Sequence, residues 1–160
     1  MFVIVLIKKS NRMIGELTKD QIENILQSQA HCRMACTDGL KPYLVPVSYA
    51  YDGKYIYCQS KEGKKITILR KNPNVCVQIE TISSMNSWQS VIVYGTFEEL
   101  KNEDAKKARE FLFSNVLTLM TSAAIHSYQH NNVNEIKDDN RIKDIMFRIK
   151  INEVTGRYEK

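Results

Sequence analysis

Residues 42–73 have the sequence PYLVPVSYAYDGKYIYCQSKEGKKITILRKNP, and this stretch decides the fold. Tyr43–Tyr51 and Lys54–Ser60 are aromatic and β-branched runs with a period of two, and Asp52-Gly53 lies between them. This pattern predicts a β-hairpin with a two-residue turn. The alternation gives the hairpin a core-facing side with Val45, Val47, Tyr49, Ile56 and Cys58, and a side suited to a binding site with Pro46, Ser48, Tyr57 and Gln59.

A phosphate-binding pattern follows the hairpin. The second strand ends near Ser60, and residues 64–71 have helical spacing up to Asn72-Pro73, which predicts a short helix that starts just past Gly63. A helix N-terminus presents unpaired N–H groups and a partial positive charge, to which Lys64 and Lys65 add full charges. Taken alone, this is also the pattern of a solvent-exposed helix start, which is the commoner case.

The remaining segments predict a mainly β protein. Thr18 and Gln21 have the spacing of a capping box, which predicts a helix that begins at Thr18. Gly95 indicates a bulge or a close backbone approach. Further strands are expected at 32–37, 75–82, 89–100 and 144–154, the last ended by Thr155-Gly156-Arg157, and an amphipathic helix from 102 to about 130. About six strands, more than one of them joined by hairpins, favour an antiparallel barrel with peripheral helices over an alternating βαβ sheet.

Length and composition indicate one soluble domain over residues 1–160, with 43% hydrophobic residues. The formal net charge of +5 favours an anionic partner, either a phosphate-bearing cofactor or nucleic acid. Four cysteines without a CxxC pair indicate reduced thiols in the cytoplasm. The apolar run Phe2–Ile7 is too short to span a membrane and lacks the basic start of a signal peptide, so we expect a strand or an arm there and no membrane partner.

The ordered motifs also resemble a known family. PYLVPVSYAYDGKYIYCQSKEGKKITILRKNPNVCVQI followed by SWQSVIVYGTFEEL, with CRMACTDG before and RIKINEVTGRYE after, is similar to the pyridoxamine 5′-phosphate oxidase-like flavin-binding proteins, in the branch with the nitroimidazole-resistance proteins. The resemblance implies an antiparallel split β-barrel of the FMN-binding type, forming a homodimer with two flavin sites at the subunit interface. FMN is the implied cofactor and FAD is the alternative.

The resemblance also implies which residues bind the cofactor. The flavin ring would lie along Val45–Tyr49, and the phosphate would be held by the segment Gln59–Lys65. Relatives often have a histidine at the position of Gln59, and glutamine cannot carry a proton near neutral pH. Catalytic residues stay unassigned, and the implied cofactor-binding residues are Pro46, Val47, Ser48, Tyr49, Gln59, Ser60, Gly63, Lys64, Lys65, Trp88 and Ser90.

Several of these residues have simpler explanations. Trp88 fits the role of a packing residue as well as that of a cofactor contact. Arg157 is either a surface charge or a flavin contact across the dimer. His126 and His130 lie four apart on the predicted helix but lack the acid of an HExxH motif, so no metal site is expected. A group of His31, Cys32 and Cys36 lacks a fourth ligand, and buried reduced cysteine is the better interpretation.

Three functions remain open from the sequence. The leading one is an FMN-dependent oxidoreductase that takes hydride from NAD(P)H and passes it to a small acceptor, such as a nitroaromatic or vitamin-B6-like molecule. The second is a flavin-binding protein for storage or sensing, without turnover. The third is a nucleic-acid-binding barrel, which lacks a recognised RNA-binding signature and would use tyrosines with Lys61, Lys64, Lys65, Arg70 and Lys71.

Overall fold

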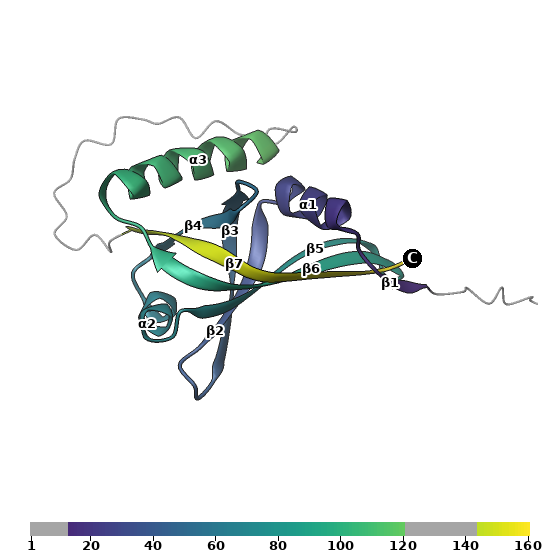
Figure 1. Ribbon diagram of the computed structural model, residues 1–160, viewed down its shortest axis with the longest axis horizontal. Coiled ribbons are helices and arrows are strands. Elements are labelled where there is room, and N and C mark those ends of the chain that lie inside the picture. Colours follow the sequence, from purple (N-terminus) through teal and green to yellow (C-terminus); the bar gives the residue numbers. More distant parts are fainter. Residues whose placement is uncertain (1–12, 121–143) are drawn as a thin grey trace, which may run out of the picture.

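The computed structural model describes residues 13–120 and 144–160, and these form an antiparallel barrel with three helices outside it (Figure 1). The sheet order is β1-β7-β4-β3-β2-β5-β6, and an additional β6–β7 pairing closes the barrel. The elements are β1 (Ile14–Glu16), α1 (Lys19–Ser28), β2 (His31–Thr37), β3 (Pro42–Tyr51), β4 (Tyr55–Lys61), α2 (Lys64–Lys71), β5 (Asn74–Ser84), β6 (Ser87–Glu99), α3 (Asn102–Met120) and β7 (Asp144–Glu159).

The predicted hairpin is β3 and β4, and its two faces are confirmed. Tyr49 pairs with Cys58, and both side chains are buried in the barrel interior. Pro46 and Ser48 lie on the opposite, outer face and are exposed. The inward side therefore supplies the core, and the outward side is free for a ligand or a partner.

The hairpin turn lies one residue later than predicted. Pairing of Tyr51 with Ile56 places Gly53 and Lys54 at the centre of the turn. The Asp52 carboxylate accepts hydrogen bonds from the backbone N–H groups of Lys54 and Tyr55, at 2.8 and 2.7 Å. Because the Asp52 side chain satisfies these donors, Asp52 ends the strand as a side-chain cap and is not a central turn residue.

Two of the helices contribute to the core of the barrel. The capping box of Thr18 and Gln21 is confirmed at the start of α1. Inside the barrel, the Tyr49 hydroxyl donates to the Leu26 carbonyl of α1 at 2.9 Å, which ties this helix to β3. Helix α2, which lies beside β2 in Figure 1, buries Ile66, Ile68 and Leu69 in the same core.

The third helix packs on the outside of the barrel. It begins at Asn102, as predicted, and lies across β3, β4 and β7 (Figure 1). Ala108 and Leu112 are buried against Ala50 of β3 and Met146 of β7. Among the described residues, none of the helices is both long and apolar enough to cross a membrane.

Two glycines in the strands show where the sequence interpretation was right and where it was wrong. The irregularity predicted at Gly95 is confirmed: the register shifts between Tyr94 and Gly95, and a Cβ at Gly95 would lie 2.4 Å from Ile149 Cγ2. Gly156 was expected to follow the last strand, but β7 continues through it. A Cβ there would lie 2.8 Å from Ile22 and 2.9 Å from Leu17, so Gly156 is required by the packing of these side chains and not by a turn.

The strand count is seven in the described residues, one more than the estimate of about six. The additional strand is β1, whose three residues pair with the end of β7. The strand or arm expected at Phe2–Ile7 and the two histidines His126 and His130 lie outside the described residues.

Candidate functional site

A pocket of about 360 Å³ lies between the hairpin and α3. Ser48 of β3 and Gln59 and Ser60 of β4 line it, so the structure brings together three of the residues singled out from the sequence. The opposite wall was not anticipated, because the segment from 102 to about 130 was predicted only as an amphipathic helix with no part in a site. The remaining lining residues are Lys61, Leu112, Phe113, Val116 and Asp144.

Gln59 carries the unusual polar atom of this pocket. Its Oε1 is buried and has no hydrogen-bond partner among the described residues. Buried polar atoms are nearly always paired, and leaving an acceptor unpaired costs about 1–3 kcal/mol. The neighbouring Ser60 hydroxyl does not relieve it, because Ser60 Oγ donates to the Lys61 carbonyl at 3.1 Å.

The predicted phosphate end lies at the start of α2, just after β4. Gly63 is the N-cap residue of this helix, and no side chain caps its first N–H groups. The φ angle of 163° at Gly63 is extended backbone that any residue can adopt, and a Cβ built there would have nothing within 4 Å. Neither backbone strain nor crowding by the described residues explains the glycine, whereas close approach of a ligand would.

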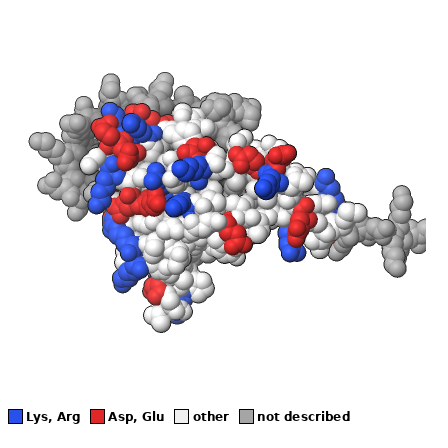
Figure 2. All heavy atoms as spheres, in the orientation of Figure 1, with Lys and Arg blue, Asp and Glu red and all other residues white. Residues whose placement is uncertain are grey.

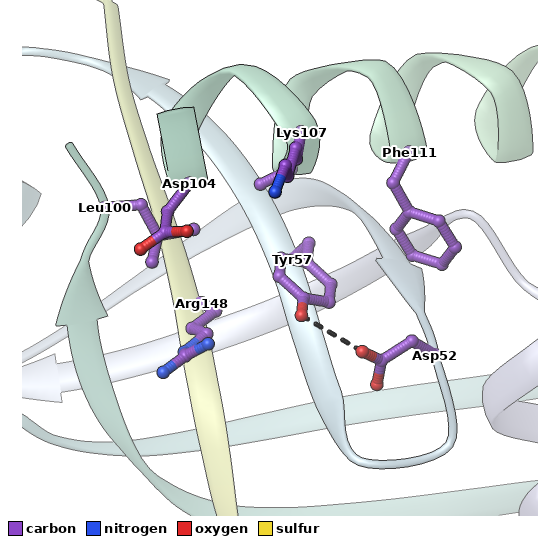
Figure 3. A pocket seen from close by; sticks show the side chains of 8 residues that line it. Asp52, Tyr57, Leu100, Asp104, Lys107, Phe111 and Arg148 are labelled. Atoms are coloured by element: carbon purple, nitrogen blue, oxygen red, sulfur yellow. Dashed lines mark hydrogen bonds between the residues drawn. The ribbon is translucent and has the colours of Figure 1, made fainter. Parts of the chain in front are cut away.

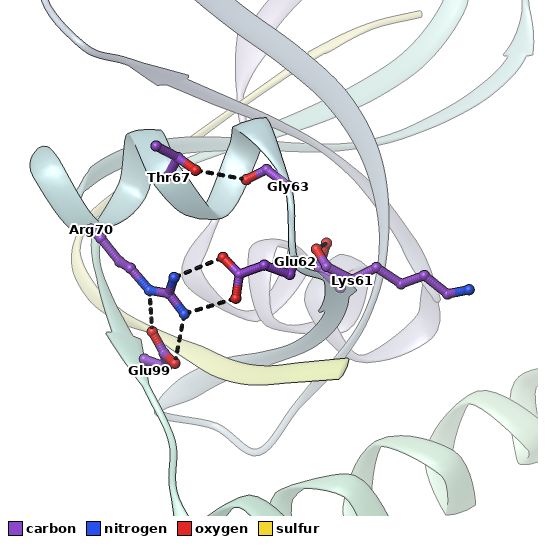
Figure 4. A network of polar contacts seen from close by, with 7 residues as sticks. Lys61, Glu62, Gly63, Thr67, Arg70 and Glu99 are labelled. Carbon is purple, nitrogen blue, oxygen red and sulfur yellow. Dashed lines mark hydrogen bonds and ion pairs between the residues drawn. The ribbon is translucent and has the colours of Figure 1, made fainter. Parts of the chain in front are cut away.

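An ion-pair network fixes the loop in front of this helix (Figure 4). Arg70 of α2 donates two hydrogen bonds to Glu62, at 2.7 and 3.1 Å. It also donates to Glu99 of β6, at 2.7 and 3.0 Å. The network therefore ties the residue before Gly63 to both α2 and β6.

The two lysines of the predicted phosphate site have different environments. Lys64 is exposed, and its Nζ lies 4.8 Å from the centre of the Tyr43 ring, a cation–π distance. Lys65 is half-buried, and burial lowers the pKa of its ammonium group, opposed by the nearby thiols of Cys58, Cys32 and Cys36. Lys64 is therefore the better placed of the two to meet an external anion.

On β3, the strand expected to carry a flavin ring, some residues present their side chains to the outer face and others present only their backbone. Pro46 and Ser48 are exposed on the outer face of β3, whereas Val47 and Tyr49 point into the core with exposed fractions of 5% and 0%. A ligand on this face would meet Val47 and Tyr49 through their backbone only. His31 pairs directly with Ser48 and is exposed beside it, a neighbour that the sequence interpretation did not use.

Trp88 and Ser90 lie on β6, apart from this pocket. Strands β2 and β5 separate β6 from β3, and neither residue lines the pocket. Trp88 Nε1 donates to Glu159 at 2.8 Å, and Ser90 Oγ accepts from Gln78 at 3.1 Å. Within one chain, the two groups of candidate residues therefore do not form one site.

A second pocket, of about 270 Å³, lies under the first turns of α3 (Figure 3). Lys107 and Phe111 point from α3 toward Tyr57 and the hairpin turn. Several of its polar groups are paired with protein groups: the Tyr57 hydroxyl donates to Asp52 at 3.0 Å, and Arg148 donates to Glu98 at 2.7 Å. The first contact lies within the hairpin and the second joins β7 to β6, in contrast to the unpaired Gln59 oxygen of the first pocket.

Comparison with known proteins identifies the family to which this split barrel belongs. Residues 18–158 match the family model described as pyridoxamine 5′-phosphate oxidase, and the chain belongs to this family. An uncharacterised protein of Rhizobium meliloti (strain 1021) is 36% identical over 84 residues, which are 52% of this chain and 56% of that protein. The matched segment therefore spans little more than half the length of this relative.

Solved structures show the same fold. An FAD-binding protein of Mesorhizobium loti has a TM-score of 0.73 and 28% identity, covering 93% of this chain and 98% of that one. A candidate 5-nitroimidazole antibiotic resistance protein of Bacteroides thetaiotaomicron has a TM-score of 0.67 and 21% identity, covering 92% and 89%. The FAD-binding protein of Mycobacterium smegmatis has a TM-score of 0.61 and 18% identity, covering 91% and 99%.

The residues of the pocket fit a flavin nucleotide. The open N-cap at Gly63 suits a phosphate, because the first amides of a helix bind anions. The outer face of β3 beside Ser48 is open to a flat ring, and the unpaired Gln59 oxygen can accept a hydrogen bond from a ring or hydroxyl donor. Ring, tail and phosphate of the ligand each have a matching feature on the same hairpin and helix.

Proposed function

We propose that the protein binds FMN at the β3–β4 pocket and acts as an oxidoreductase on a small acceptor. The observation that carries the proposal is Gly63, whose open Cβ position lies at an uncapped helix start just beyond the pocket residues Gln59 and Ser60. Membership of the pyridoxamine 5′-phosphate oxidase family supports it.

Different residues of this chain would bind the phosphate and the ring of the cofactor. The amides at the start of α2, with the ammonium of Lys64 and the hydroxyl of Ser60, hold the phosphate. The exposed surface of Pro46 and Ser48, with the backbone of Val47 and Tyr49, supports the ring, and Gln59 hydrogen-bonds it. Lys65 adds positive potential from within the barrel.

A bound flavin supplies two-electron chemistry, taking hydride from a reduced nicotinamide and passing it to an oxidised acceptor. Leu112 and Val116 of α3 give the pocket an apolar wall opposite Gln59. FAD contains the same flavin mononucleotide half and is the alternative cofactor, supported by the FAD-binding relative of M. loti.

A homodimer is part of the proposal. The outer face of β2, β3, β5 and β6 exposes Leu44 and Tyr94, with exposed fractions of 61% and 49%. The surface over β2 and β3 is largely uncharged, whereas lysines and arginines gather over α2 (Figure 2). A shallow groove of about 240 Å³ on this face is lined by Ala35, Cys36, Thr37, Pro42, Asn74, Val75, Cys76 and Tyr94.

A second copy of the chain on this face would complete the site. It would cover the exposed apolar side chains, which contribute favourably when they are removed from water. It would also bring Trp88 and Ser90 of one subunit toward the pocket of the other. Arg157, which is exposed on β7 and pairs with Ser90, would approach with them. We place the dimer in the cytoplasm because all four cysteines are free thiols.

A second candidate function is flavin storage or sensing without turnover. Gln59 favours it, because an amide cannot donate a proton to a reaction as histidine can. Steady-state oxidation of NADH and NADPH, measured with nitroaromatic, quinone and pyridoxal-type acceptors, separates the two functions. Turnover with any acceptor supports the enzyme, and stable flavin binding without turnover supports storage or sensing.

The structure gives little support to the nucleic-acid-binding alternative. Its stacking platforms would be tyrosines, but Tyr49 is fully buried. Tyr55 is covered by the Arg148 guanidinium, 4.1 Å from its ring centre, and Tyr57 packs against Phe111 with ring centres 5.4 Å apart. These rings are used within the protein, so we propose no nucleic-acid partner.

A further inference from the structure

His31 of β2 lies in one row with two residues of the β3–β4 pocket. The β2–β3 register pairs His31 with Ser48 on one side of β3. On the other side, the β3–β4 register, continued by one residue, brings Gln59 next to Ser48. The alternation of buried and exposed residues places all three side chains on the outer face, where Ser48 and Gln59 line the pocket. His31 therefore stands at the edge of this pocket.

The strand pairing also holds His31 close to Ser48. The Tyr49 N–H donates to the Ala30 carbonyl at 2.9 Å, as in a hydrogen-bonded pair of an antiparallel ladder. The next pair along, His31 with Ser48, is then a non-hydrogen-bonded pair. Side chains approach most closely in such pairs, with Cβ atoms about 4.5–5.5 Å apart. The imidazole is therefore carried next to the Ser48 side chain, on the face of β3 proposed to support the ring.

His31 is also the residue of this row that is suited to moving a proton. A histidine side chain takes up and releases a proton near neutral pH, whereas serine and glutamine side chains do not. It is the one histidine within the described ranges 13–120 and 144–160. Arg33, two residues along the same face of β2, is ion-paired with Glu80 of β5, which compensates the positive charge beside the imidazole.

We propose that His31 transfers a proton to the acceptor in the proposed reaction, and that the acceptor belongs to the class whose oxygen is protonated as it is reduced, such as a quinone. This inference rests on the proposed function and deepens it. One quinone oxygen receives hydride that NAD(P)H supplies through the cofactor, and the other receives the proton on Nε2 of the His31 imidazolium. The products are the hydroquinone and a neutral imidazole, which regains its proton from water.

The first experiment compares two acceptors in wild type and His31→Gln, a substitution that keeps a polar side chain and removes the transferable proton. Each protein is loaded with FMN, reduced with stoichiometric dithionite and mixed in stopped flow with p-benzoquinone or with ferricyanide. Ferricyanide is the control acceptor, because it takes electrons without a proton. Return of the oxidised flavin absorbance should be about 100-fold slower in His31→Gln with the quinone and unchanged with ferricyanide.

A second measurement does not depend on turnover. Proton NMR of the FMN-free protein follows the imidazole Cε1–H signal of His31, which is assigned as the histidine signal that His31→Gln lacks. Addition of FMN at constant pH should shift this signal, because an aromatic ring next to Ser48 acts on nearby protons. Inorganic phosphate, which has no ring, is the control ligand and should leave the signal in place.

Selective slowing of the quinone reaction together with an FMN-dependent shift of the His31 signal is the expected result. Quinone oxidation at the wild-type rate in His31→Gln overturns the proposal, and so does equal slowing with both acceptors. A His31 signal that FMN does not move, or a reduced wild type that the quinone does not oxidise, also overturns it. Protein that takes up no FMN overturns the proposed function itself, and this result is visible at the loading step, before any variant is compared.

Discussion

Arg70 holds Glu62 by two hydrogen bonds, at 2.7 and 3.1 Å, one residue before the helix start at Gly63. The same guanidinium is anchored to Glu99 at the end of β6, so the loop is fixed to the barrel from both sides (Figure 4). A fixed loop presents the first amides of α2 in one orientation, which lowers the entropy cost of binding an anion there.

Arg70→Met should loosen this loop without changing the pocket. We expect FMN affinity to fall roughly three- to tenfold while the far-UV circular dichroism stays unchanged, since the ion pairs are exposed and contribute little to global stability. Arg109→Met, at an exposed arginine of α3 outside the network, is the control. Equal affinity in the two variants would show that the network has no part in binding.

Gly63→Ala separates folding from binding at the phosphate end. A methyl group there meets no protein atom within 4 Å, so the variant should unfold at the wild-type temperature. It should bind FMN about tenfold more weakly, because the added group occupies the space of an approaching phosphate. Isothermal titration calorimetry measures the affinity.

Gly53→Ala is the matched control for that variant. Gly53 has a φ of +91°, which side chains rarely adopt, so this substitution should cost about 1 kcal/mol of stability and leave the affinity unchanged. Full FMN affinity in Gly63→Ala would mean that the phosphate binds elsewhere.

The buried thiols predict a loss of stability in alkali. Burial raises the pKa of Cys32 from 9.0 to about 12 and raises the pKa of Cys58 well above 9.0. The folded state then binds more protons than the unfolded state above pH 9.0, so the free energy of unfolding falls as pH rises through that range. Urea unfolding at roughly pH 8, 9.5 and 11, on either side of the ordinary thiol pKa, measures this loss of stability.

Two variants check the origin of this slope. Cys58→Ala removes one of the raised thiols and should make the alkaline loss shallower. Lys65→Met should make the alkaline loss steeper. Burial lowers the pKa of Lys65 below 10.5, so the contribution of Lys65 to the free energy of unfolding increases with pH toward that value and partly offsets the thiols. A slope that neither variant changes would assign the alkaline loss to other groups.

Leu44→Glu should separate the proposed dimer. The side chain is 61% exposed on the outer face of β3, and a buried unpaired carboxylate at an interface is strongly unfavourable. We expect a monomer in sedimentation velocity that also loses flavin, since Trp88 and Ser90 no longer reach the partner's pocket. Met85→Glu, at a 94% exposed turn residue, should stay dimeric. Retention of both dimer and flavin by Leu44→Glu would contradict the proposed interface.

The hairpin and both of its faces could be predicted because a period of two fixes which side chains share a face. The start of α1 could be predicted from Thr18 and Gln21 because a capping box depends on residues close in the chain. The role of Gly156 could not, because it depends on Leu17 and Ile22, which are distant in sequence. Strand β1 was missed because three residues are too few to show alternation.

The candidate site also contains some residues that local sequence predicts and others that depend on tertiary packing. Gly63 and Ser60 could be identified from local order, a strand end followed by a glycine and a helix. The α3 wall of Leu112 and Val116 could not, since helical spacing does not tell a core from a pocket. The unpaired oxygen of Gln59 and the inward environment of Lys65 arise from tertiary packing and are visible only in the folded chain.

The visible absorption spectrum of the purified protein, before and after addition of FMN and FAD, tests the central claim most directly. The account predicts the flavin spectrum, shifted and quenched in fluorescence relative to free flavin, at one flavin per chain. A colourless protein that takes up neither FMN nor FAD would contradict it.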